Sequence, residues 1–465
     1  MKDVIAQCLK SLTDLTKWDE GVFEVVCRTT CGVSAALLEA IDDELVKDRD
    51  EGLRMISRRS RTIVTKFGNF KVMRRMYRDR SGRSRFLLDE VLGLIKGSQA
   101  THSLQATVLK LAATMPFRQA AEVLEETSGG VLSHQMIHRI LQSKGAALDT
   151  QEKISTDGLT KDGELPRSQN KKVARLFVEG DGTFINLQRQ NKRKAEVKLI
   201  TAHEGWERVG KNKYKLKDKT VLAGLDGADI TWDRFTSKLL ETYHPEVLSN
   251  LVIGGDGASW IKAGTSVFGD STYQLDRFHL RRAMLRATGN MGSAAKAYAL
   301  AAAGDTKGAI AVLDRVAAKE PKREPELKKA ANYLKTNASG LVDYRHRIPN
   351  PNSDMRGLGA IESNIDKILA NRMKKRGMAW GYSGAHHMAK VIQMLANGES
   401  PSYQLKESHK KIIKTVRRSI SESLEESPAT WLASRMPALI GPHQGRPWVK
   451  ALRSLAHIQT VGTQL

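Results

Sequence analysis

Two short apolar runs decide the fold that we expect: residues 173–181, VARLFVEGD, and residues 251–256, LVIGGD. Each run has the length and apolar character of a buried β-strand, and each stops at an aspartate that is followed by glycine. We therefore expect Asp181 and Asp256 to lie at the ends of two neighbouring strands, at one edge of a sheet.

Further strands and helices surround these two runs. Strands are expected at 195–206, 220–229 and 272–276, and helices at 232–243 and 258–264. Three strands, a helix, a strand, a helix and a strand is the order of the ribonuclease-H-like fold. We therefore predict an α/β catalytic core of this kind, and its first part covers residues 173–284.

A third acid, Glu362, begins the helical stretch AIESNIDKILANRMKKRG. Before it, residues 285–350 are rich in alanine, lysine, glutamate and leucine, which predicts an all-helical insertion. The last helix of the core then lies within 351–400, and a basic helical region is expected at 401–465. Residues 150–172 are polar and contain glycine and proline, which predicts a linker ahead of the core.

The three acids together indicate a metal site. Carboxylates at Asp181, Asp256 and Glu362 suit a pair of Mg²⁺ or Mn²⁺ ions, which assist the attacking and leaving oxygens in phosphoryl transfer. The glycine after each aspartate would leave room for a substrate backbone. Spacing alone favours three unrelated surface acids, and Glu179 and Asp366 are rival ligands.

An Asp-x-x-His pair, Asp276 and His279, follows the last predicted strand. The pair would lie near the second aspartate, where it could orient water or a DNA phosphate. The simpler alternative is that Asp276 caps a helix and that His279 packs in its first turn.

The charge of the chain indicates its kind of partner. The chain has 465 residues, with 75 Lys and Arg against 51 Asp and Glu, a net charge of +24 and a pI of about 9.9. This excess favours double-stranded DNA, because binding to phosphates releases condensed counterions. A merely soluble basic protein is the alternative.

Signals for membrane insertion or secretion are not evident in the sequence. No run approaches about 18 apolar residues, so we expect no membrane segment and a cytoplasmic, nucleoid-associated location. Cys8, Cys27 and Cys31 lack zinc-ligand spacing and are expected to be reduced thiols.

Residues 1–100 predict helices and one basic β-hairpin, TIVTKFGNFKVMRRMYRDR, with a two-residue turn at Gly68-Asn69. Its second strand carries Arg74 and Arg75, which could follow a DNA backbone. A solvated edge strand that resists aggregation is an equally good interpretation.

Residues 101–150 have the pattern of a helix-turn-helix. Two adjacent glycines would form the turn, and Ser133 would cap the second helix. Gln135 and Arg139 would then point outward, where a recognition helix meets base edges. A three-helix packing without DNA contact is the alternative.

The helix that begins near the third acid turns strongly basic. Its cations Arg372, Lys374, Lys375 and Arg376 could hold DNA beside the cleavage point. Trp380 could stack on a displaced base, although a buried core tryptophan is the commoner case.

Several motifs together resemble one family. The arginine hairpin followed by LLDEVLGL, then EGDGT, GGDGASWIK, LDRFHL and GAIESNIDKILANRMKKRGMAWG, is similar to the ISLre-type insertion-sequence transposases of the DDE class. The Asp-x-x-His pair is also similar to the Mutator-like group. The resemblance implies a ribonuclease-H-like domain with a helical insertion, a catalytic triad of Asp181, Asp256 and Glu362, and Asp276 with His279 as auxiliary residues.

The resemblance also implies a function. The enzyme would bind the terminal repeats of its element through the N-terminal region, cleave the ends and join their 3′ ends to target DNA, as a homodimer or larger assembly. Two alternatives remain: an inactive, co-opted transposase that regulates by binding DNA, and a ribonuclease-H-like nuclease that cleaves without joining.

Overall fold

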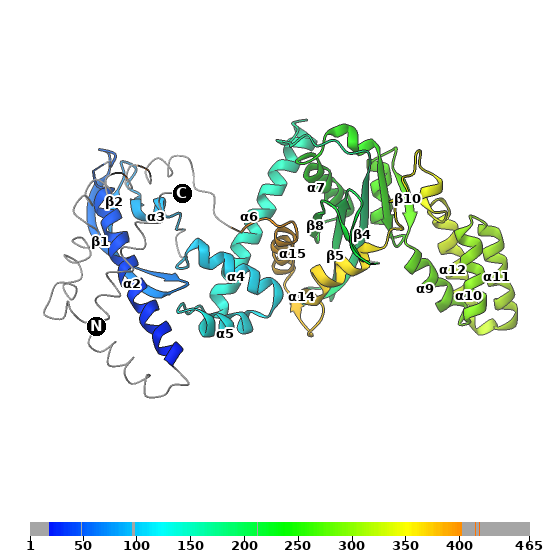
Figure 1. The fold of residues 1–465 in the computed structure, drawn as a ribbon, viewed down its shortest axis with the longest axis horizontal. Helices are drawn as coiled ribbons and strands as arrows, with labels where there is room; N and C mark the ends of the chain where they lie inside the picture. Colours follow the sequence, from blue (N-terminus) through cyan, green and yellow to red (C-terminus); the bar gives the residue numbers. More distant parts are fainter. Residues whose placement is uncertain are drawn as a thin grey trace. The chain divides into compact units, whose positions relative to one another are not determined.

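The computed structural model describes residues 18–47, 49–94, 98–211, 213–401, 414 and 418. The chain is a mixed α/β protein that divides into two compact units (Figure 1). Unit 1 comprises Met1–Ala112, Pro116–Ile140 and Pro401–Leu465; unit 2 comprises Ala113–Met115 and Leu141–Ser400. Cys8 and nearly all of the helical region expected at 401–465 lie outside the described residues.

A long helix packed against a three-stranded sheet begins unit 1. Its elements are α2 (Trp18–Glu44), β1 (Arg54–Thr65), β2 (Gly68–Arg78), β3 (Ser84–Arg85) and α3 (Leu87–Val91). The sheet is antiparallel in the order β1-β2-β3, and Ile63, Val72 and Leu88 form part of its core. Cys27 and Cys31 on α2 carry free thiols.

The hairpin turn differs from the prediction. Thr65 pairs with Gly68, so the two turn residues are Lys66 and Phe67 rather than Gly68-Asn69. The hydroxyl of Thr65 donates to the Gly68 carbonyl at 3.0 Å and accepts from the Phe67 amide at 3.1 Å. The backbone φ of +136° at Gly68 then starts the second strand, which is a conformation that glycine tolerates.

Helix α2 bears on the expectation about membrane segments, which stays a prediction. It is long and apolar enough, by length and composition only, to cross a membrane. Length and composition do not distinguish such a helix from one that packs in a soluble protein. Its C-terminal end contacts β2, where Asp42 accepts from the Arg75 amide and guanidinium.

The predicted helix-turn-helix is formed by α5 (Phe117–Thr127) and α6 (His134–Lys161), preceded by α4 (His102–Thr114). The amide of Met136 donates to the Ser133 hydroxyl at 3.3 Å, which confirms the expected cap. At Gly129 and Gly130, a Cβ atom would collide with the backbone of the β1–β2 turn, so glycine is required for this close packing.

The expected linker at 150–172 is wrong over its first half, because α6 continues to Lys161. Polar side chains at and just before the start of this part of α6 bind elsewhere in unit 2. Asp149 lies 2.5 Å from Arg234, and Glu152 lies 2.5 Å from Lys390, which is buried. These ion pairs hold a helical segment whose composition alone is typical of a loop.

The sheet of unit 2 has the order β10-β9-β4-β5-β8, with β11 paired to β4. Strands β4, β5 and β8 are antiparallel in succession, whereas β9 and β10 run parallel to β4. Strands β6 and β7 form a separate hairpin. The bounds are β4 (Leu176–Leu187), β5 (Lys194–His203), β6 (Trp206–Gly210), β7 (Lys213–Leu216), β8 (Thr220–Gly224), β9 (Leu251–Gly255), β10 (Thr272–Leu275) and β11 (Ala379–Trp380).

The sequence predicts that the first of these strands ends at Asp181. In the structure, β4 continues to Leu187. Antiparallel pairing with β5 persists from Asp181, opposite Leu199, to Asn186, opposite Lys194. The glycine after the aspartate therefore does not break the strand. Strand β9 ends at Gly255, so Asp256 directly follows it, in agreement with the prediction.

Helices cover both faces of this sheet. On one face, Val178 and Ile200 pack with Trp232 and Phe235 of α7 (Ala228–Leu240) and with Ile261 of α8 (Ser259–Val267). The other face is contacted by α13 (Ala360–Ile365) at β4. Helix α15 (Tyr382–Ala396) lies along the edge strand β8, where the Ala223 amide donates to the Gln393 side chain. The core is thus a three-layer α/β arrangement (Figure 1).

Four consecutive helices occupy the interval between β10 and α13: α9 (Arg277–Thr288), α10 (Met291–Ala302), α11 (Thr306–Lys319) and α12 (Glu324–Thr336). Side-chain caps start three of them, since Asp276, Asn290 and Asp305 each accept from an amide in the following turn. Figure 1 shows the helices packed beside one another beyond β10, where the sequence predicts a helical insertion.

Candidate active site

Strand register places three aspartates in one row. Gly180 on β4 pairs with Gly255 on β9, and Gly255 pairs with Leu275 on β10. Side chains alternate between the two faces of a sheet. The residue after each of these paired positions therefore has its side chain on the same face of the sheet. Those residues are Asp181, Asp256 and Asp276.

Glu362 lies on the helix that covers this face. It occupies the first turn of α13, which contacts β4, and its side chain is 48% exposed. His279 lies between this glutamate and the row: Nε2 is 3.8 Å from Glu362 Oε2, and Nδ1 is 3.6 Å from Asp276 Oδ1. The structure therefore brings together all five residues that the sequence singled out here.

The electrostatics of Asp181 reflect this crowding. Burial raises the pKa of Asp181 to about 6, and the charges of Asp256 and Glu362 act in the same direction. The Gly182 amide, which donates to Asp181 Oδ1 at 2.7 Å, and nearby His279 lower the pKa less. The site thus places a buried carboxylate, Asp181, close to the half-buried Asp256 and the half-exposed Glu362, and a bound cation would relieve their mutual repulsion.

Asp276 has the simpler role that the sequence allowed, since it caps α9. Its Oδ1 accepts from the amides of Phe278 at 2.6 Å and His279 at 3.0 Å. Burial opposes ionisation, but the hydrogen bonds from His279 outweigh it and lower the pKa of Asp276. Interaction with Asp276 in turn raises the pKa of His279, whose Nδ1 is buried without a hydrogen-bond partner.

The two glycines after the aspartates lie close to other atoms of the chain, and their expected role in substrate approach stays a prediction. Gly257 has a φ of +97°, and a Cβ there would lie 2.8 Å from Asn337 Oδ1. A Cβ at Gly182 would collide with the Glu196 carboxylate. Gly257 therefore disfavours a side chain through its backbone conformation, whereas at Gly182 the flexible end of Glu196 would have to move.

Glu179, the rival ligand, holds the helix that carries Glu362. Its buried carboxylate accepts from the amides of Gly359 at 2.8 Å and Ile361 at 3.2 Å. The other oxygen lies 3.4 Å from His203 Nε2. Sequence reasoning missed this role, although the two-residue spacing from Asp181 places both acids on one face.

Asp366, the weaker rival, lies in the π-helical segment Asp366–Ala370 and pairs with Lys375 at 2.6 Å. The side chains of Asp366 and Lys375 are both about half exposed, as expected for a surface ion pair. We therefore assign neither Glu179 nor Asp366 to the row of acids.

The donor set suits a hard divalent cation. Within the described residues, no three His, Cys, Asp or Glu side chains are gathered closely enough to form a metal site as they stand. The carboxylates of Asp181, Asp256 and Glu362 nevertheless supply the oxygen ligands that Mg²⁺ and Mn²⁺ prefer. Mg²⁺ retains several waters and uses substrate phosphates, so it does not require a closed cage of protein ligands.

The arginines predicted to contact DNA in unit 1 are engaged inside it. Arg74 is buried, binds Asp89 at 2.7 Å and lies 3.9 Å from the centroid of the Phe86 ring. Arg75 binds Asp42 at 2.7 Å and also pairs with Asp43. Both guanidinium groups therefore hold the sheet against neighbouring helices, and this corrects the expectation that they point toward a DNA backbone.

The basic stretch after Glu362 is divided in the same way. Arg372 is buried over the Trp380 ring, and burial lowers its pKa to about 10. Trp380 is also buried and donates to the Met373 carbonyl at 2.8 Å, so the core interpretation holds for it. Lys374 and Arg376 are exposed, as are Gln135 and Arg139 on α6.

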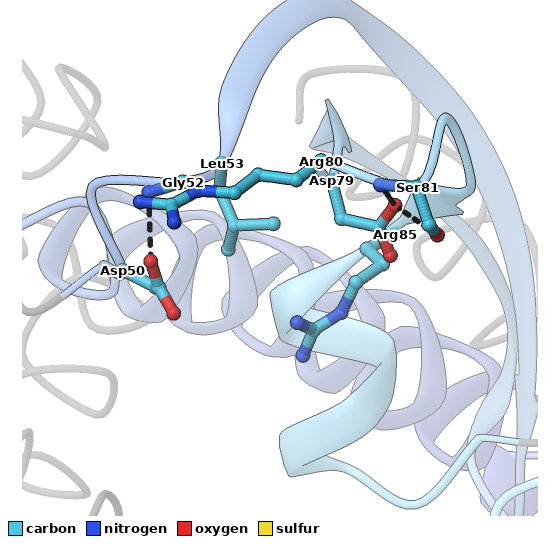
Figure 2. A pocket seen from close by; sticks show the side chains of 7 residues that line it. All are labelled: Asp50, Gly52, Leu53, Asp79, Arg80, Ser81 and Arg85. Atoms are coloured by element: carbon cyan, nitrogen blue, oxygen red, sulfur yellow. Dashed lines mark hydrogen bonds between the residues drawn. The ribbon is translucent and has the colours of Figure 1, made fainter.

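Unit 1 contains a hollow of about 370 Å³ whose polar lining residues bind other residues of unit 1 (Figure 2). Asp50 accepts from the Gly52 amide at 2.7 Å, and Asp79 accepts from the Ser81 hydroxyl at 2.6 Å. Arg85 pairs with Glu90 at 2.5 Å. These contacts shape the loops around β3 and indicate no chemistry.

Comparison with known proteins gives a family model and distant relatives. The model of an uncharacterised protein family, UPF0236, matches residues 9–411. One relative is a UPF0236 protein of Caldanaerobacter subterraneus subsp. tengcongensis, and its name joins a series of locus designations. It is 23% identical over 446 residues, which is 91% of this chain and 90% of that protein. A UPF0236 protein in the vanSb 3′ region of Streptococcus gallolyticus is 26% identical over 404 residues, covering 85% and 86% of the two chains.

Proposed function

The chain belongs to the uncharacterised protein family UPF0236, and we propose that it is a DDE transposase that cleaves the ends of a mobile DNA element and joins their 3′ ends to target DNA. One observation carries the proposal: Asp181, Asp256 and Asp276 form a row on one face of the sheet, and Glu362 stands on the helix that covers this face. This arrangement combines carboxylates from parallel strands with one from a helix.

The order of the strands supports the same proposal. A central sheet with three successive antiparallel strands, followed by two strands parallel to the first, is the arrangement of the ribonuclease-H-like fold. The four helices between β10 and α13 would then be an insertion ahead of the helix with the third acid. We accordingly propose a ribonuclease-H-like catalytic core for unit 2.

Each residue of the site has a proposed task. Asp181, Asp256 and Glu362 would hold Mg²⁺ or Mn²⁺, and the bound ions would supply charge compensation at the scissile phosphate. With a pKa of about 6, Asp181 is largely ionised at neutral pH and can serve as an oxygen donor. His279, whose pKa is raised beside Asp276, would place a proton near the DNA phosphate.

The proposed substrate is double-stranded DNA. The net charge of +24 favours a polyphosphate partner, and Gln135 and Arg139 are exposed on the second helix of the helix-turn-helix. A relative whose name joins many loci of one genome fits a sequence present in several copies, as mobile elements are. Pairing two element ends would require a homodimer or larger assembly, in the cytoplasm at the nucleoid.

The test is a cleavage and joining assay. Purified protein is incubated with Mg²⁺ and labelled duplexes taken from the DNA that flanks its gene, and Asp256→Asn is compared with the unchanged protein. We expect metal-dependent nicking and 3′-end joining that the substitution abolishes while DNA binding persists. Retained cleavage and joining by Asp256→Asn would overturn the proposal.

The same assay separates the competing functions. Binding of the ends without any cleavage would identify a DNA-binding regulator. Metal-dependent cleavage without joining, independent of the end sequence, would identify a structure-selective nuclease. Either result would replace the transposase proposal.

A further inference from the structure

We propose that the tip of the β4–β5 hairpin is a binding site for the phosphate backbone of duplex DNA. The proposal rests on the proposed function and deepens it, because it assigns a surface of unit 2 that would hold the DNA backbone. Among the positions proposed above to contact DNA, none lies on this hairpin.

The hairpin tip borders a hollow of about 460 Å³ in unit 2 with a strongly basic lining. Four cations line it, and Glu196 is the acid among its lining residues. Glu196 accepts from the Trp260 indole at 3.2 Å, so it is already engaged inside unit 2. The cations are Arg189, Lys192, Lys194 and Lys198.

Three of these cations are free to meet a ligand. In the part of the chain that the structure describes, Arg189, Lys192 and Lys194 are exposed and their side chains make no ion pair or hydrogen bond. Lys198 donates to the Asp226 carbonyl at 2.6 Å, which is a neutral partner that leaves its charge uncompensated. The contrast is with Arg74 and Arg75, whose charges are matched by carboxylates.

Backbone hydrogen bonds close the base of the hairpin tip. The Leu187 amide donates to the Arg193 carbonyl at 2.8 Å, and the Gln188 amide donates to the Trp380 carbonyl at 2.9 Å. Backbone that is already ordered loses less entropy when it binds a partner. The tip is therefore suited to holding a regularly spaced ligand such as a phosphate backbone.

The outer edge of β5 adds possible backbone donors. Strand β8 pairs with β5 only from Lys198 to Ala202. Among the described residues, the edge from Lys194 to Val197 has no strand beside it on that side. Backbone amides commonly bind DNA phosphates together with lysine and arginine, so this edge and the cations can serve one ligand.

The position along β4 sets the distance from the chemistry. Leu187, at the end of the strand, lies six residues beyond Asp181. At about 3.3 Å per residue, this spans about 20 Å. Because side chains alternate along a strand, Lys194, opposite Asn186, and Lys198, opposite Gly182, face the other side of the sheet from Asp181. DNA held by these cations would therefore pass around the hairpin tip.

The test compares two triple variants that lose the same charge. Arg189→Gln, Lys192→Gln and Lys194→Gln neutralise the hairpin, whereas Lys307→Gln, Lys319→Gln and Lys322→Gln neutralise exposed positions between β10 and α13. Fluorescence anisotropy then gives the affinity for end-containing duplex over a range of salt concentrations. Each lost phosphate contact lowers the slope of log affinity against log salt by about 0.9.

We expect the hairpin variant to lose about two to three from this slope and at least about tenfold in affinity, whereas the control stays near the unchanged protein. Hydroxyl-radical footprinting should show protection lost on DNA that flanks the cleavage point. An unchanged slope and footprint, or an equal loss in the control, would overturn the inference while leaving the catalytic proposal intact. Failure of the unchanged protein to bind duplex DNA would overturn both.

Discussion

The row of acids in unit 2 and the arginine hairpin in unit 1 were both singled out by sequence, yet the structure treats them differently. Asp181 on β4 and Asp256 at the end of β9 lie on one face of the sheet, and each is close to other negative charges. Arg74 and Arg75 instead meet carboxylates from adjacent helices. Uncompensated charge in a protected setting indicates chemistry, whereas compensated charge indicates structure.

The largest expected effect concerns Glu362. If it belongs to the site, Glu362→Gln should lower the rate of metal-dependent cleavage roughly 1,000-fold, which corresponds to about 4 kcal/mol. Asp366→Asn, one turn further along, removes the same charge from a surface ion pair and should change the rate less than about threefold. Single-turnover cleavage measures both, and equal losses would remove the distinction between the two acids.

The arginine hairpin should respond in stability. Asp89→Ala removes the carboxylate that binds Arg61 at 2.6 Å and Arg74 at 2.7 Å, and the three side chains are nearly buried. Leaving such charges unpaired costs about 3 kcal/mol in the free energy of unfolding. Denaturant unfolding measures this cost. A loss below about 1 kcal/mol would show that Arg74 is available for other partners.

The metal-free protein should be destabilised by its own site. The folded pKa of Asp181, about 6, lies above the ordinary value of 3.8, so the folded state binds more protons between these values and loses stability as pH rises through them. Asp181→Asn should therefore be more stable than the unchanged protein by up to about 3 kcal/mol above about pH 7. The advantage should shrink toward about pH 4.

Unfolding followed in the presence of a chelator, at several pH values, tests this dependence. Added Mn²⁺ should stabilise the unchanged protein more than the variant, because binding to the folded state adds to its stability. A difference that does not vary with pH would mean that Asp181 is not held in a buried, acidic setting.

The smallest effect is expected at Glu179. Glu179→Gln keeps an oxygen that can accept from the Gly359 and Ile361 amides but removes the charge beside His203. Because groups that orient ligands tune a metal site, we expect about a tenfold higher metal requirement with unchanged DNA affinity. Cleavage titrated with Mn²⁺ measures the requirement. A loss comparable to that of Glu362→Gln would instead make Glu179 a ligand.

Sequence predicted which acids lie together better than which arginines are exposed, and the reason is physical. Alternation along strands and the order of elements are local properties, and they suffice to place Asp256 after β9 and to suggest its neighbours. The end of β4 was misjudged because cross-strand pairing with β5 carries it past Asp181. Glycine after an aspartate signals a turn only where no partner strand continues.

The remaining errors share one cause, which is contact between segments distant in sequence. Residues 150–161 have the composition of a linker, but α6 there is anchored through Glu152 to Lys390. From its basic sequence context, Arg372 is expected at the surface. In the structure it is buried beside the Trp380 ring. Whether a charged side chain is free or paired depends on partners that spacing along the chain does not reveal.

Metal binding by the isolated protein tests the central claim most directly. The experiment is a Mn²⁺ titration monitored by electron paramagnetic resonance. It compares the unchanged protein with the double variant Asp181→Asn/Asp256→Asn and with the surface control Asp314→Asn/Asp366→Asn. We expect bound Mn²⁺ in the unchanged protein and the control, and a loss of at least about tenfold in affinity when the two aspartates of the row are neutralised. Equal Mn²⁺ binding by all three proteins would contradict the assignment of this row as a metal-dependent catalytic site.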